Sequence, residues 1–274
     1  MTRLGVIIVA GILLGAGCGR NDRKAPLEVT YIANEGFMVS TGGATVLIDA
    51  LPGSKYYANP SDTLTARIIN GIPPFDRVDY VLVTHDHPDH FNAGLMSRFL
   101  LNHPAAQFIA SPETCSKVNG DSIGGRRLSG IDLALGEHRT IRGGGADIVA
   151  LRLSHGADAE ISNLAYVVRS NGYTFVHVGD ARLSENKEYL RTLDWESYDV
   201  DLLFIEFFDH SDETREIIET MIKPDHVVLM HIPPGEEDAV RNADEKVHPR
   251  TVVFGAEGET RRFDRIPDGG ASHP

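Results

Sequence analysis

The segment Thr84–His90, which reads THDHPDH, decides how the rest of the sequence is interpreted. It follows an apolar run, Val78 to Val83, whose short length and β-branched and aromatic residues are typical of a buried strand. A strand that ends in three histidines and two aspartates delivers several ligands to one point at the edge of a sheet. Neutral imidazole and carboxylate together suit Zn²⁺, with Fe and Mn as alternatives. The segment therefore predicts a metal site.

The spacing within this segment has a geometric reason. His85 and His87 are two residues apart, so on an extended chain both side chains point the same way. The next stretch, Phe91 to Leu101, predicts a helix whose first turn carries Asp89 and His90. Four donors from two short elements would then surround two adjacent metal ions. The alternative is a solvated polar loop without a ligand role.

The pattern His-x-His-x-Asp-His at residues 85–90 resembles the signature of the metallo-β-lactamase superfamily. The resemblance implies an α/β fold, a four-layer αββα sandwich with a dinuclear metal site at one edge. The alternation of strands and short helices in two halves supports a single sandwich. We expect this hydrolase domain to span residues 27–263, with a loose tail at 264–274.

Three further ligand candidates each follow a predicted strand. His155 comes after the strand Ala146 to Leu153, Asp180 after Gly179, and His231 after a last apolar strand. Judged from its own neighbours, His155 could equally be a surface residue and Asp180 a helix cap. The resemblance implies one metal held by His85, His87 and His155, another held by Asp89, His90 and His231, and Asp180 bridging the two.

The resemblance also implies the chemistry of this site. Two Zn²⁺ ions, or Fe or Mn in their place, would share a water molecule and generate hydroxide as the nucleophile. Asp89 would orient the hydroxide and accept its proton. Asp49, which closes an earlier strand, would support the metal loop by orienting a ligating imidazole, although it could also be a turn former.

The expected activity is metal-dependent hydrolysis of a small ester, lactone or phosphoester. Motifs for a serine nucleophile or a phosphate-binding loop are absent from the sequence. True β-lactamases of the superfamily generally lack a bridging aspartate, so Asp180 indicates the lactonase and phosphodiesterase branches instead. The alternative is a lipid-anchored metal-binding or sensor module that does not turn over a substrate.

The substrate side is less defined by the sequence. Arg182 could hold an anionic group of a small-molecule substrate, and His210 could contact the substrate or donate a proton. Both could instead be ordinary surface residues, and Glu35 is a weaker candidate for the same role. The formal charge of −13 argues against nucleic acid as a partner, because such binding depends on Lys and Arg neutralising phosphates. The oligomeric state is left open.

The N-terminus resembles a bacterial lipoprotein signal. Residues 1–17 contain Arg3, an apolar run and small residues before Cys18, which would become the acylated first residue of the mature chain. Residues 18–26 would form a tether. Gly19 favours the outer membrane, so we expect a lipid-anchored protein of the bacterial cell envelope, on the periplasmic side. Cys115 would then have no partner for an intrachain disulfide.

Overall fold

The computed structural model describes residues 25–264, apart from residues 119, 157, 159 and 244–246. The predicted signal segment, the lipidation site Cys18, most of the tether and the tail beyond residue 264 lie outside the described residues. Within the described part, no helix has both the length and the apolar character that a membrane span requires.

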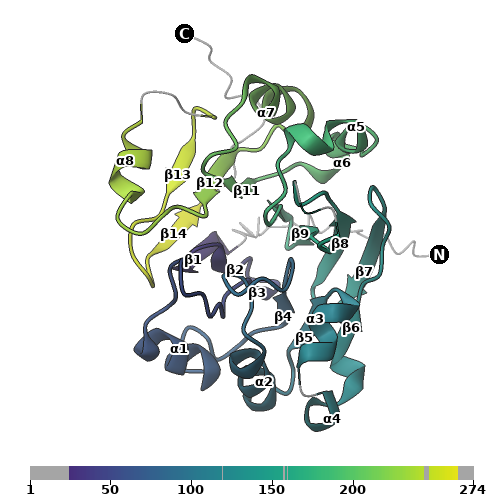
Figure 1. Ribbon diagram of the computed structural model, residues 1–274, viewed down its shortest axis with the longest axis vertical. Helices are drawn as coiled ribbons and strands as arrows, with labels where there is room; N and C mark the ends of the chain where they lie inside the picture. The colour runs from purple at the N-terminus through teal and green to yellow at the C-terminus, as the bar shows by residue number, and fades with distance from the viewer. Residues whose placement is uncertain (1–24, 119, 157, 159, 244–246, 265–274) are drawn as a thin grey trace, which may run out of the picture.

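Two mixed β-sheets of seven strands each lie face to face among the described residues (Figure 1). The first sheet has the order β14 (Thr260–Phe263), β1 (Leu27–Ala33), β2 (Gly36–Ser40), β3 (Thr45–Ile48), β4 (Tyr80–Leu82), β5 (Gln107–Ala110) and β6 (Leu128–Gly130). The second has the order β13 (Thr251–Val253), β12 (His226–Met230), β11 (Leu202–Glu206), β10 (Tyr173–His177), β9 (Leu164–Ser170), β8 (Ala146–Arg152) and β7 (His138–Gly143).

Helices cover the outer face of each sheet (Figure 1). Beside the first sheet lie α1 (Asp62–Ile69), α2 (Ala93–Asn102), α3 (Pro112–Lys117), α4 (Gly120–Ile123) and the 3-10 turn η1 (Gly125–Arg127). Beside the second lie η2 (Ser184–Asn186), α5 (Lys187–Leu190), α6 (Trp195–Tyr198), α7 (Asp212–Ile217), its π-helical continuation η3 (Ile218–Ile222) and α8 (Glu237–Arg241). The predicted four-layer αββα architecture is confirmed.

Alternating apolar side chains explain why the first sheet is buried on both faces. In β3, Val46 and Ile48 belong to the core between the two sheets, whereas Leu47 packs with the layer of α1 and α2. In β4, Tyr80 and Leu82 face the second sheet in the same way, and Val81 faces the helices. Such strands are apolar along their whole length, which is why they stand out in the sequence.

One element prediction was wrong and one strand was missed. The helix expected from Phe91 begins at Ala93, because the Asn92 side chain caps it by accepting a hydrogen bond from the Leu95 amide. Asp89 and His90 therefore lie in the turn before the helix and not in its first turn. The sequence reading also missed β14, which pairs with β1 and returns the end of the chain to the first sheet.

The topology brings several strand ends to one edge of the sandwich. Strands β3 and β4 are parallel in the first sheet, as are β10, β11 and β12 in the second. Parallel strands present their carboxyl ends at the same edge, where loops carrying functional side chains gather. Asp49, His85, Asp180, Glu206 and His231 all stand at or just after such ends.

Candidate metal centre

Four of the predicted ligands form a first cluster. His85, His87, His155 and Asp180 each offer a ligand atom, and these atoms all lie within 4.8 Å of one another. The Nε2 atom of His85 is 3.0 Å from His87 Nδ1 and 3.3 Å from His155 Nε2. His155 comes from the second sheet, so the cluster joins the two halves of the sandwich.

These distances suit a single small cation. Nitrogen donors about 2.0–2.1 Å from a tetrahedral Zn²⁺ lie roughly 3.3 Å from one another. Asp180 Oδ2 is 3.3 Å from His155 Nε2 and 3.8 Å from His85 Nε2, which places one carboxylate oxygen against the same point. Three imidazoles and a carboxylate are also a donor set that Zn²⁺, Fe and Mn accept.

A second cluster shares Asp180 with the first. Its other oxygen, Oδ1, lies 2.9 Å from His90 Nε2, and both atoms are buried without a hydrogen-bond partner among the described residues. Two ligand atoms held close together outside hydrogen-bond geometry fit a shared metal ion. Asp89 Oδ2 lies 3.2 Å from His231 Nε2 and 3.7 Å from His90 Nε2. The structure thus brings together all seven residues of the predicted set.

Glu35, a weak candidate for substrate contact in the sequence, lies in this second cluster. Its carboxylate lies with ligand atoms of His90, Asp180 and His231, all within 4.8 Å of one another, and Oε2 is 3.7 Å from His90 Nδ1. The sequence offered no strong signal for it, since an acidic residue in a hairpin turn is normally solvated. Here the Glu35 side chain is fully buried.

Asp49 has the orienting geometry that the resemblance implied. Its carboxylate accepts hydrogen bonds from the Thr84 amide at 2.9 Å and the Thr84 hydroxyl at 2.7 Å. It also lies 3.0 Å from His90 Nδ1, which leaves Nε2 of that ring free to face Asp180. A carboxylate on the far nitrogen of an imidazole fixes both its tautomer and its direction.

Three residues around the centre have left-handed backbone. Asn34, Asp49 and His231 have φ angles of +51°, +44° and +58°. This region is sparsely populated by residues other than glycine, and the strain is retained where the surrounding structure fixes the backbone.

Burial and charge divide the histidines into two kinds. Burial lowers the pKa of His85 well below its usual value, so this ring is neutral and has a lone pair to offer. Burial also lowers the pKa of His90, but the nearby Asp180 and Glu35 carboxylates outweigh it and raise the pKa well above the usual value. The same carboxylates create a field that attracts a divalent cation.

A cavity of about 510 Å³ opens beside the two clusters. It is lined by His155, Gly156, Asp180, Arg182, Glu185, Glu206 and Phe208. The Arg182 guanidinium lies over the Phe208 ring, 5.4 Å from its centroid, and 3.6 Å from Glu185. Burial and the Asp180 charge raise the pKa of Glu206 to about 8. Glu206 closes a buried strand, the same signal that singled out the metal loop, but the sequence reading gave it no role.

His210 is not brought to this cavity. It is exposed and lines a separate, more apolar cavity together with Phe207, Leu229 and residues of α8. The neighbouring ring that does reach the clusters is Phe208, 6.0 Å from the ring of His231. Tyr57 packs against His231 from the long loop before α1, at 4.6 Å between centroids. Neither aromatic contact was foreseen.

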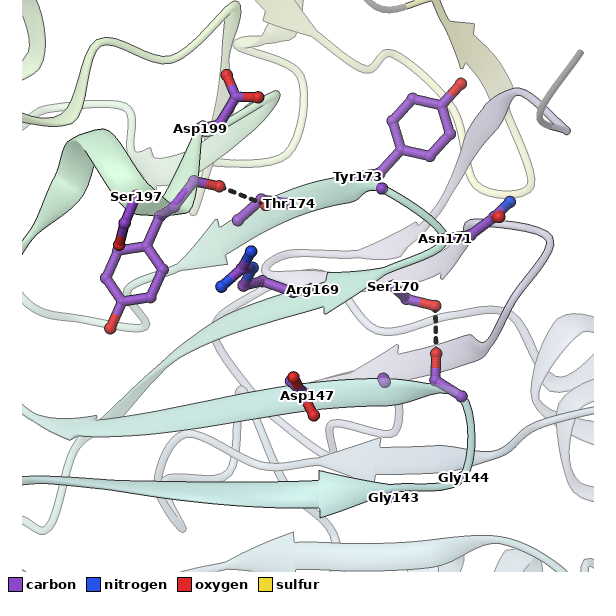
Figure 2. A pocket seen from close by; sticks show the side chains of 14 residues that line it. Gly143, Gly144, Asp147, Arg169, Ser170, Asn171, Tyr173, Thr174, Ser197 and Asp199 are labelled. Carbon is purple, nitrogen blue, oxygen red and sulfur yellow. Dashed lines mark hydrogen bonds between the residues drawn. The ribbon is translucent and has the colours of Figure 1, made fainter.

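A larger cavity, of about 610 Å³, lies at the other end of the second sheet (Figure 2). It is lined by the glycine turn 143–145, by the turn between β9 and β10, and by Ser197 to Asp199. Its charged side chains include Asp147 and Arg169, which are cross-strand neighbours and offset each other. No histidine lines it, so the candidate metal centre belongs to the cavity beside the two clusters.

Comparison with known proteins agrees with this arrangement. A family model described as a β-lactamase superfamily domain matches residues 44–254, a span that contains every predicted metal ligand. The chain belongs to the metallo-β-lactamase superfamily.

Relatives within the superfamily match over most of their length. A UPF0173 metal-dependent hydrolase of Nitratidesulfovibrio vulgaris is 25% identical over 253 residues, which cover 88% of this chain and 98% of the relative. Another, from Caldivirga maquilingensis, is 27% identical over 243 residues, covering 82% of this chain and 92% of the relative. The metallo-β-lactamase fold protein YhfI of Bacillus subtilis superposes with a TM-score of 0.60 at 18% identity, over 87% of this chain and 100% of that one. The likeness to YhfI concerns the fold alone.

Proposed function

We propose that the protein is a hydrolase with two adjacent metal positions that cleaves a small ester, lactone or phosphoester. The observation that carries the proposal is the convergence of five imidazoles and two carboxylates, from both sheets, beside an open cavity that His155 and Asp180 line. The metal-dependent hydrolases among the relatives support it. Zn²⁺ is the ion that the histidine-rich donor set favours, with Fe or Mn as alternatives.

The residues divide the work between binding and proton transfer. Metal ions bound at this centre would lower the pKa of a water molecule and polarise the reacting oxygen of the substrate. His85, His87 and His155 would hold one ion, Asp89, His90 and His231 the other, with Asp180 between them. No serine, cysteine or lysine nucleophile is then needed.

Asp89 would orient the attacking water and accept its proton. Burial raises the pKa of Asp89, but the hydrogen bond with His231 and the neighbouring His90 lower it by more, so the net pKa lies below the usual value. The carboxylate is therefore ionised at neutral pH, the form in which it can orient a water molecule by accepting a hydrogen bond from it. Its 3.2 Å contact with His231 Nε2 fixes its direction.

Arg182 is the cation that a substrate entering the cavity would meet. Its side chain is about half exposed, rests on Phe208, and is held near Glu185. A guanidinium in this position could bind a carboxylate or phosphate of the substrate through two parallel hydrogen bonds. This favours a small anionic ester or lactone, or a phosphoester, over a neutral substrate.

A lipid anchor at Cys18 would place the enzyme at the periplasmic face of the outer membrane. Cys18 lies outside the described residues, so this location is a proposal from the sequence alone. Labelling with a radioactive fatty acid in a bacterial host, compared between the wild-type chain and Cys18→Ala, tests it. The variant should lose both the label and its association with the membrane.

Metal content and a substrate panel test the proposed hydrolase. The protein loaded with Zn²⁺ should contain two ions per chain and hydrolyse at least one generic phosphodiester, lactone or thioester, with β-lactam hydrolysis absent. His87→Ala should reduce turnover by more than the roughly 10- to 100-fold that loss of an orienting partner costs. His210→Ala, on the separate cavity, is the matched control and should keep its activity.

Two outcomes would reject the proposal. A protein that binds fewer than two ions per chain under saturating Zn²⁺ lacks the proposed centre. A protein that binds two ions but hydrolyses none of the panel behaves as the alternative, a metal-binding or sensor module.

A further inference from the structure

The turn between β1 and β2 places a buried acid at the base of the second cluster. Glu35 is 0% exposed, and neither of its carboxylate oxygens has a hydrogen-bond partner among the described residues. Burying an ionised carboxylate without a partner is costly, so proteins generally pair such groups or use them to bind metals. The burial of the Glu35 carboxyl group therefore needs a physical explanation.

The backbone on both sides of Glu35 is fixed. The Asn34 side chain donates a hydrogen bond to the Asp89 carbonyl at 3.3 Å, which ties the turn to the metal loop. Gly36 packs so tightly that an added Cβ would stand 2.7 Å from the Asp49 carbonyl oxygen. The carboxyl group is therefore aimed by its surroundings and has little freedom to turn toward water.

His177 links this turn to the bridging aspartate. Its Nε2 donates to the Glu35 carbonyl at 3.0 Å, and its Nδ1 accepts a hydrogen bond from the Gly179 amide at 3.2 Å. Both ring nitrogens are therefore engaged with backbone, so His177 is not a ligand. It holds Glu35 and Asp180 in a fixed relation across the two sheets.

We propose that Glu35 is an additional ligand of the second metal position, together with His90, Asp180 and His231. The inference rests on the proposed dinuclear function. Two observations support it. One ligand atom from each of these four residues lies within 4.8 Å of the others. Several of the buried atoms have no hydrogen-bond partner among the described residues: Glu35 Oε1 and Oε2, His90 Nε2 and Asp180 Oδ1. A cation at this point would satisfy all of these buried atoms together.

Ligand number then differs between the two positions. The first position has three imidazoles and one carboxylate oxygen, whereas the second would gain a further carboxylate from a separate hairpin. More oxygen donors suit Fe or Mn better than Zn²⁺. With Glu35 as a ligand, the second position would have more oxygen donors than the first and would bind oxygen-preferring ions such as Fe or Mn better.

Replacing Glu35 by methionine should change two quantities in opposite directions. In metal-free protein, Glu35→Met removes a buried acid that has no hydrogen-bond partner among the described residues and should raise the melting temperature, because apolar replacement of buried ionic groups is often stabilising. In titrations with Zn²⁺ and Mn²⁺ against a chromophoric chelator, the affinity of the weaker of the two positions should fall at least tenfold. The rise in melting temperature on adding saturating metal should shrink accordingly.

Glu206→Gln is the matched control, since Glu206 is another buried acid beside Asp180 but lies outside both clusters. It should keep two metal ions at near wild-type affinity. Equal losses in the two variants would overturn the inference and leave only a general effect of charge. A lower melting temperature of metal-free Glu35→Met, together with unchanged metal affinity, would also overturn it and assign Glu35 a structural role. Wild-type protein that binds no second ion would reject the proposed function instead.

Discussion

Asp49 shows how much a single buried carboxylate controls at the residue scale. It joins the loop backbone, through Thr84, to the far nitrogen of His90, and so sets where that imidazole points. Its left-handed backbone shows that the position is held by its surroundings and not by local preference.

Asp49→Asn should reduce metal affinity without removing a ligand. In one orientation, the amide would present its NH₂ group to His90 Nδ1 and force the wrong tautomer. In the other, it would lose a hydrogen bond from Thr84. We expect a roughly 10- to 100-fold lower affinity for the second ion, measured by competition with a chelator. Asp79→Asn is the control, because Asp79 also accepts a backbone hydrogen bond, from Thr45, but at the start of β4. Equal effects of both variants would contradict the orienting role.

Arg182→Ala should affect the KM for anionic substrates selectively. Loss of the guanidinium beside Phe208 removes the group proposed to hold a substrate anion, and a tenfold rise in KM corresponds to about 1.4 kcal/mol. The kcat, and the KM for a neutral ester, should stay near wild type. Arg191→Ala, an exposed residue paired with Glu188, should change neither constant. An equal rise for neutral and anionic substrates would exclude recognition of charge.

At the scale of elements, the sequence predicts strands well and helix starts poorly. The strands that lead to the ligands are short, apolar on both faces and end in histidine or aspartate, so their pattern is legible in the sequence. The start of α2 depends on a side-chain hydrogen bond, from the Leu95 amide to Asn92, which no hydrophobic period encodes. Because of that capping bond, two of the candidate metal ligands, Asp89 and His90, lie in a turn and not in the predicted helix.

Asn92→Ala should destabilise the protein through the helix and not through the metal. Loss of an N-cap side chain costs about 0.5–2 kcal/mol. Urea unfolding of metal-free protein should show this loss as a lower midpoint with an unchanged slope. Asn92→Asp keeps the capping oxygen and should unfold near the wild-type midpoint. If both variants lost the same stability, the capping bond would not be the cause.

At the scale of the whole molecule, the end of the chain fastens the two sheets together. Strand β14 pairs with β1 in the first sheet, while Arg261 donates a hydrogen bond to the Val253 carbonyl in β13 of the second, at 2.9 Å. Phe263 is buried and packs against His226, at 5.2 Å between ring centroids. The sequence reading missed this strand because TRRF has only one apolar residue in four.

The candidate metal ligands were easier to predict from the sequence than the residues that surround them. The seven ligand candidates follow apolar strands and match a family signature, and the structure brings them together. Glu35 was only a weak candidate for substrate contact, and Tyr57 and Glu206 had no predicted role, because their positions beside the clusters result from packing between segments far apart in the sequence. No local pattern distinguishes a turn acid that will be buried from one that will be solvated.

Removing β14 should expose an unpaired edge of the first sheet that promotes aggregation. A chain ending after Gly255 leaves β1 with unpaired backbone groups, and such edges pair with other molecules. Compared with a chain ending at Asp264, it should melt at a lower temperature and scatter more light at the same concentration. A monodisperse truncated protein with an unchanged melting temperature would show that β14 does not stabilise the sheet.

The left-handed backbone at Asn34, Asp49 and His231 has a consequence for how this chain can evolve. An L residue in such a conformation costs of order 1–3 kcal/mol, so each position offers an easy gain in heat resistance to any lineage that relaxes it. Selection for robustness alone should therefore substitute these three positions early. We therefore expect a descendant that stays folded at higher temperature through these substitutions to bind metal more weakly.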